Sequence, residues 1–128
     1  MRRVGLGVVF LWFAIGGVAH FVATDAFVAI VPPWVPLPRA AVLVSGALEL
    51  AGAAGLLFPR TRRAAGIGLL LLTVAVTPAN VYMLQRVELF ERVPYWALVA
   101  RLPLQLALLA LIAWSARVLD GRPGAVAR

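Results

Sequence analysis

The sequence contains no cysteine and no lysine, and it has only five acidic residues and one histidine. Without cysteine, the protein has no disulfide exchange, no thiolate nucleophile and no Cys-ligated metal or iron–sulfur centre. With a single histidine, we expect no dedicated metal site. The chain also lacks a glycine-rich phosphate loop and a sequence motif typical of a Ser/His/Asp catalytic triad. Nothing therefore indicates the usual chemistry of soluble enzymes.

Apolar residues dominate the sequence instead. They make up 63% of the 128 residues, and the mean hydropathy is +0.97, whereas a soluble domain is about 45–50% apolar. Several near-continuous apolar runs of about 20 residues indicate membrane-spanning helices. We therefore predict an all-α, integral membrane four-helix bundle that forms a single domain over residues 1–128, with helices at about 4–24, 39–58, 64–84 and 95–119.

The first apolar run follows two arginines and has small residues near its end, as a secretory signal peptide does. It continues through His20 and Phe21, which makes it longer than the usual apolar region of about 7–15 residues. We therefore expect a first transmembrane helix that is not cleaved.

All of the cationic side chains are arginines, and the net charge is +7. Such a charge would suggest a nucleic-acid partner in a soluble protein, but these arginines lie at predicted helix ends, where they set membrane topology, so we expect no nucleic acid. With a cytoplasmic N-terminus, the outer loops carry only Arg39, Arg86 and Arg92, offset by Asp25, Glu88 and Glu91. The pattern predicts cytoplasmic N- and C-termini in a bacterial cytoplasmic (inner) membrane, with the inner arginines being Arg2, Arg3, Arg60, Arg62, Arg63, Arg117, Arg122 and Arg128.

Prolines and small residues predict the helix ends and contacts. Four prolines within residues 32–38 prevent a regular helix, so we expect residues 25–38 to form an outer loop that caps the bundle. Pro78 should kink the third helix, and residues 59–63 should form a tight basic turn. Ala47, Ala51 and Gly55 recur at intervals of four and predict a close helix contact. The residues expected to form the cap are Pro33, Trp34 and Pro36.

Glu49 is the most informative polar residue, because it lies in the middle of the second apolar run. A charge at that depth costs about 2.5–3.5 kcal/mol unless it is compensated. If the outer helix ends share one level, His20 lies about 6 Å deep, Arg101 about 9 Å and Glu49 about 15 Å. The long Arg101 side chain can span the difference, so we predict a Glu49–Arg101 ion pair.

Every predicted helix contributes a polar residue to the outer half of the membrane. This distribution predicts an outward-facing polar pocket, in which Glu49 and Arg101 form the charged centre. Purely structural alternatives stay open. The ion pair could serve only to fix helix packing, and the Asn80 and Gln105 amides could form hydrogen bonds between helices. The pocket residues are Glu49, Arg101, His20, Asn80, Gln105, Ser45 and Thr77.

The order of several segments resembles the DoxX family of small four-helix bacterial membrane proteins. The segments are residues 16–21, 31–38, 45–52, 57–60, 77–83 and 101–105. The resemblance implies a likeness to the membrane subunit of a thiosulfate:quinone oxidoreductase or to members of redox-stress complexes.

The expected function is therefore that of an oxidoreductase-associated subunit or small-molecule binder, with a quinone as candidate ligand. Its expected partners are the lipid bilayer and membrane or redox proteins. Two other functions stay open at this point: a non-enzymatic membrane scaffold or assembly factor, and a transporter, which would need a homo-oligomer.

Overall fold

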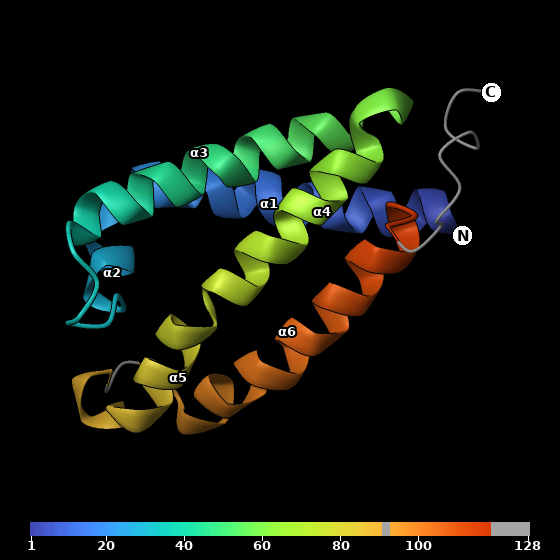
Figure 1. The fold of residues 1–128 in the computed structure, drawn as a ribbon. Coiled ribbons are helices and arrows are strands. Elements are labelled where there is room, and N and C mark those ends of the chain that lie inside the picture. Colours follow the sequence, from blue (N-terminus) through green and yellow to red (C-terminus); the bar gives the residue numbers. More distant parts are fainter. Residues whose placement is uncertain (91–92, 119–128) are drawn as a thin grey trace.

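Helices form nearly all of the computed structural model, which describes residues 1–90 and 93–118 (Figure 1). No strand occurs among these residues. The elements are α1 (Arg2–Val22), α2 (Thr24–Ala29), α3 (Pro38–Leu56), α4 (Pro59–Ala75), α5 (Thr77–Gln85), the 3₁₀ helix η1 (Val87–Leu89) and α6 (Tyr95–Ser115).

Four helical segments within the described residues are long and apolar enough to cross a membrane. They are α1, α3, α4 together with α5, and α6. This arrangement confirms the all-α class and the pattern of a multi-pass membrane protein. Arg92, Glu91, Arg122 and Arg128, on which part of the topology prediction rests, and the predicted helix end at 119 lie outside the described residues.

The predicted basic turn at residues 59–63 is wrong, because these residues form the first turn of α4. Pro59 occupies the start of the helix, where its fixed φ is suitable and no N–H is needed. Two side chains of this turn satisfy carbonyls at the end of α3: Thr61 Oγ1 donates to Gly55 O at 2.7 Å, and Arg62 Nε donates to Leu56 O at 2.9 Å. The connection between α3 and α4 is therefore much shorter than predicted.

The predicted kink at Pro78 is confirmed. The helix ends at Ala75, and α5 begins at Thr77 with Pro78 in its first turn. Proline has no N–H and its ring clashes with the carbonyl four residues earlier, so the helix cannot continue in a straight line. The break lies directly before Thr77 and Asn80.

Part of the predicted outer loop is helical, since α2 occupies residues 24–29. Residues 31–37 are irregular, as the prolines predict. Thr24 Oγ1 donates to His20 O at 2.8 Å, and an exposed Arg39–Asp25 pair at 3.0 Å joins α2 to the start of α3. α2 also packs against α3.

The hydrophobic core lies in the half of the molecule that contains the start of α1 and the end of α6. Each spanning segment packs against two others in the cyclic order α1, α3, α4, α6. At the other end, α5 and the first turns of α6 lie apart from α1 and α3 (Figure 1). The buried core residues are Val9, Phe13, Ala53, Leu56, Leu69, Ile112 and Ala116.

Glycines set the close crossing of α1 and α3. A Cβ added to Gly17 would lie 3.1 Å from Gly46 O, and one added to Gly46 would lie 2.6 Å from His20 Cβ. Small residues allow such approaches between membrane helices. Of the predicted seam through Ala47, Ala51 and Gly55, only Gly55 makes a close helix contact, since an added Cβ there would lie 2.8 Å from Ala65 Cβ of α4, whereas Ala47 and Ala51 are exposed.

Candidate functional site

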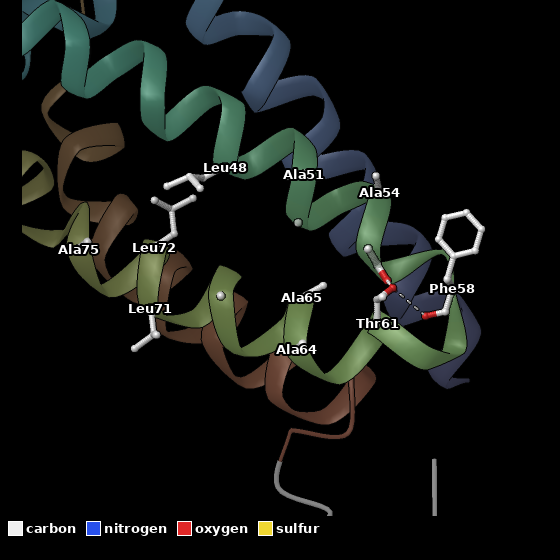
Figure 2. A pocket seen from close by; sticks show the side chains of 13 residues that line it. Leu48, Ala51, Ala54, Phe58, Thr61, Ala64, Ala65, Leu71, Leu72 and Ala75 are labelled. Carbon is white, nitrogen blue, oxygen red and sulfur yellow. Dashed lines mark hydrogen bonds between the residues drawn. The ribbon is translucent and has the colours of Figure 1, made fainter. Parts of the chain in front are cut away.

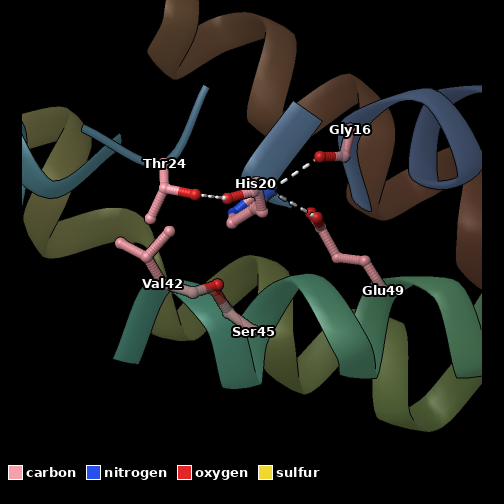
Figure 3. Close-up of polar contacts among 6 residues, drawn as sticks. All are labelled: Gly16, His20, Thr24, Val42, Ser45 and Glu49. Atoms are coloured by element: carbon pink, nitrogen blue, oxygen red, sulfur yellow. Dashed lines mark hydrogen bonds and ion pairs between the residues drawn. The ribbon is translucent and has the colours of Figure 1, made fainter. Parts of the chain in front are cut away.

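His20 and Glu49 face each other across the α1–α3 crossing (Figure 3). His20 Nδ1 lies 3.1 Å from Glu49 Oε2, and the two side chains are only 10% and 13% exposed. Gly46 brings the backbones close enough for this contact. Opposite Glu49, Gly16 has no side chain, and an added Cβ there would lie 3.7 Å from Oε2.

The His20 ring is held in place by more than the carboxyl group. Nδ1 also lies 2.7 Å from Gly16 O, one turn earlier in α1. Both neighbours of Nδ1 are oxygens, so the arrangement requires a hydrogen on Nδ1. One face of the ring stacks on Phe27 of α2, with centroids 4.0 Å apart.

Glu49 Oε2 is buried and receives no hydrogen bond from the described residues. Its contact with Nδ1 is therefore mainly electrostatic, because Nδ1 hydrogen-bonds to Gly16 O. A buried polar atom without a hydrogen bond is rare and costly, so each one needs a specific explanation.

The predicted Glu49–Arg101 ion pair is not formed among the described residues. Glu49 pairs with His20, and Arg101 Nε donates to Asn80 Oδ1 at 3.2 Å. The physical reason is the helix order: α3 packs against α1, α2 and α4, whereas α6 packs against α1, α4 and α5. Glu49 and Arg101 therefore lie on helices that are not direct neighbours.

Four polar side chains instead form a ladder between α5 and α6. Asn80 Nδ2 donates to Gln105 Oε1 at 2.7 Å, and Gln105 Nε2 donates to Thr77 Oγ1 at 2.5 Å. With the Arg101–Asn80 bond, the ladder has three rungs. This arrangement is the interhelical hydrogen bonding that was left open as the structural alternative for Asn80 and Gln105.

A cleft of about 830 Å³ lies between α2 and the α5–η1–α6 region. Arg101 and Glu88 line it, and the rest of its wall is apolar. The bond to Asn80 uses Nε of Arg101, so within the described residues the two terminal nitrogens have no hydrogen-bond acceptor. The cleft therefore combines apolar walls with a half-buried cation.

Phe27 connects the cleft to the histidine, because it lines the cleft and stacks on His20. The predicted cap residues lie elsewhere: none of Pro33, Trp34 and Pro36 lines the cleft. Trp34 contacts Tyr82 edge to face at 6.5 Å, and so ties the proline segment to α5.

The predicted pocket residues thus separate into two groups. His20 and Glu49 form one, and Thr77, Asn80, Arg101 and Gln105 form the other; no described hydrogen bond or ion pair joins them. Ser45 belongs to neither hydrogen-bond set, because its hydroxyl donates to Val42 O at 2.9 Å.

Sequence reasoning missed the roles of Phe27, Gly17 and Gly46. The glycines carry a usable signal, since Gly17 and His20, and likewise Gly46 and Glu49, are three residues apart and share one helix face. Phe27 carried no such signal, because the segment around it was predicted to be a loop.

The chain matches a family model over residues 9–119, described as a domain of unknown function (DUF8561). The match covers most of the sequence. The chain belongs to this family. The matched segment includes every residue of both polar groups, so the site described above lies within the family domain.

No curated protein and no solved structure matches the chain. The description of the family states no activity. The resemblance to DoxX proteins therefore stays a prediction, based on the sequence segments alone.

Proposed function

We propose that this DUF8561 protein is a multi-pass membrane protein that binds a small amphiphilic ligand in the cleft beside Arg101. The observation that carries the proposal is a half-buried guanidinium in a mostly apolar cleft, whose terminal nitrogens have no hydrogen-bond acceptor among residues 1–90 and 93–118. Ligand sites are typically apolar cavities with a few placed polar groups. A ligand with a flat apolar body and a carbonyl or anionic head would suit this cleft.

A quinone is the candidate ligand, as the resemblance to DoxX proteins implies, and the process would be redox-linked. Arg101 would donate a hydrogen bond to a quinone carbonyl, and Phe27 would contact the ring. His20 and Glu49, behind Phe27, would hold or release a proton close to the ligand. Redox partner proteins and a homo-oligomer belong to the same proposal.

The test uses decylubiquinone and the purified protein in nanodiscs, with tryptophan quenching as the readout. Arg101→Gln should weaken saturable binding by roughly tenfold to a hundredfold, because a hydrogen bond to a charged group contributes about 1.5–3 kcal/mol. Arg39→Gln is the matched control, since Arg39 is exposed, pairs with Asp25, and neither of these two residues lines the cleft. Equal affinity in Arg101→Gln, or quenching that never saturates, would refute the proposal.

We further propose the bacterial inner membrane as the location, with the α3–α4 turn on the cytoplasmic side. The described arginines support this orientation, since Arg60, Arg62 and Arg63 follow that turn and only Arg39 and Arg86 flank the opposite ends of the spans. The chain has no cysteine, so single-cysteine variants can be labelled without first replacing native cysteines. Phe58→Cys should react with an impermeant maleimide only after the cells are opened, and Trp34→Cys should react in intact spheroplasts.

The alternative is a non-enzymatic scaffold or assembly factor. The Thr77–Gln105–Asn80 ladder favours it, because these hydrogen bonds fix helix packing without a ligand. Copurification separates the two functions. A partner protein that is retained by an Arg101→Gln/Glu49→Gln variant, together with no saturable quinone binding, would favour the scaffold.

A further inference from the structure

A second concavity lies between α3 and α4, away from both polar groups (Figure 2). It is a laterally open groove of about 750 Å³, within the range of small-molecule sites. Leu48 and Leu72 flank one end, and Phe58 and Thr61 lie at the turn that closes the other (Figure 2). Both helices belong to membrane-spanning segments, so the groove faces the apolar part of the bilayer.

The groove is shaped by small residues and offers almost no polar group. Ala51 and Gly55 of α3 face Ala64 and Gly68 of α4 across it. The one hydroxyl in the wall, Thr61 Oγ1, already donates to Gly55 O at 2.7 Å. A polar ligand would lose its hydration here without gaining hydrogen bonds, so the chemistry of the wall selects a hydrocarbon chain.

The length of the groove corresponds to the thickness of the hydrocarbon region of one leaflet. From Leu48 to Phe58 the helical rise amounts to about 15 Å, and the whole hydrocarbon core of a bilayer is about 30 Å thick. An occupant that enters at the α3–α4 turn would therefore reach about the middle of the membrane. This is the depth of one acyl chain of a lipid in that leaflet.

Three arginines lie next to the α3–α4 turn that closes one end of the groove. Arg60, Arg62 and Arg63 lie in the first turns of α4, and no acidic residue occurs in its first turn. Arg62 and Arg63 each direct Nε to a backbone carbonyl, Leu56 O and Val118 O. Arg60 is exposed. Basic pockets between helices at the cytoplasmic side are suited to anionic head groups.

We propose that the α3–α4 groove binds one anionic glycerophospholipid, with an acyl chain between the helices and the phosphate at Arg60. The apolar wall and its one-leaflet length account for the chain. The arginines at the turn account for the preference for an anionic head group. The site is independent of the cleft beside Arg101.

Two glycines allow a matched test of chain binding. A Cβ at Gly68 or at Gly7 would meet nothing within 4 Å, but only Gly68 lines the groove. Leucine is favoured over glycine in a helix by up to about 1 kcal/mol, so neither Gly68→Leu nor Gly7→Leu should unfold the protein. The delipidated protein is titrated with phosphatidylglycerol and with chain-matched phosphatidylcholine, and native mass spectrometry measures the lipid bound.

The wild-type protein and Gly7→Leu should retain phosphatidylglycerol, whereas Gly68→Leu should lose most of it. Arg60→Gln should lower the preference for phosphatidylglycerol over phosphatidylcholine about fivefold, which corresponds to about 1 kcal/mol per basic residue. Unchanged lipid binding in Gly68→Leu would overturn the proposal. A dimer that Gly68→Leu alone converts to a monomer would overturn it as well, since a second copy would then occupy the groove.

Discussion

His20 Nδ1 lies between Gly16 O at 2.7 Å and Glu49 Oε2 at 3.1 Å. One nitrogen of the only histidine in the chain therefore contacts both a carbonyl oxygen of its own helix and a carboxyl oxygen of the neighbouring helix. This relationship determines which nitrogen of the neutral ring carries the hydrogen, and it depends on the close crossing of α1 and α3. It leads to the first two predictions below.

The first prediction concerns the His20 tautomer. When the ring is neutral, it should carry its hydrogen on Nδ1, because a bare Nδ1 would face two oxygens with no hydrogen between them. Since His20 is the only histidine, ¹⁵N NMR of histidine-labelled protein gives one set of ring signals to assign. A spectrum dominated by the Nε2–H tautomer would show that the Gly16 and Glu49 contacts do not exist in the bilayer.

The second prediction concerns the helix crossing. Gly46→Ala should destabilise the protein by about 1–3 kcal/mol, the usual cost of overpacking, because the new Cβ would lie 2.6 Å from His20 Cβ. It should also displace the histidine and speed its modification by diethylpyrocarbonate. Thermal unfolding in detergent and mass spectrometry measure the two effects. Gly7→Ala is the control, with open space around its added Cβ, and an equal effect of both variants would contradict the prediction.

The third prediction concerns the ladder between α5 and α6. Gln105 takes part in two of the three hydrogen bonds, with Asn80 and with Thr77. Gln105→Leu should therefore cost about 0.6–2 kcal/mol, the range for hydrogen bonds between membrane helices. Leu106→Ala is the comparison, since Leu106 is 67% exposed. A double-mutant cycle of Asn80 and Gln105 that gives no coupling would mean that the bond contributes nothing to stability.

The fourth prediction concerns pH and the charge of the cleft. The hydrogen bond from Arg86 lowers the pKa of Glu88 below its ordinary value of 4.5. Glu88 therefore stays ionised above that value, and the Arg86–Glu88 pair is lost only as the pH falls through the lowered pKa. Between pH 8 and about pH 5, Glu88→Gln should leave the pH dependence of cleft binding unchanged. A pH dependence in this window that disappears in Glu88→Gln would contradict the assignment.

The spanning helices followed directly from the sequence. Runs of about 20 apolar residues must form helices in a bilayer, because lipid offers no partner for backbone N–H and C=O groups. The kink at Pro78 was equally predictable, since proline removes a helix hydrogen bond wherever it lies inside a helix. The first turn of α4 was missed because residues 60–63, three of which are arginines, have a polar composition that is typical of a loop.

The partner of Glu49 was decided by the tertiary structure. The sequence placed Glu49 about 9 Å deeper than His20 because both depths were counted from helix ends at one level. In the fold, α2 and the proline segment lie beside the start of α3, so α3 extends past the end of α1 and Glu49 reaches the level of His20. The sequence alone determined which residues are embedded, because hydrophobic length is a local property. The pairs they form depend on helix order, offset and the Gly17–Gly46 crossing, which are set by packing between segments far apart in the chain.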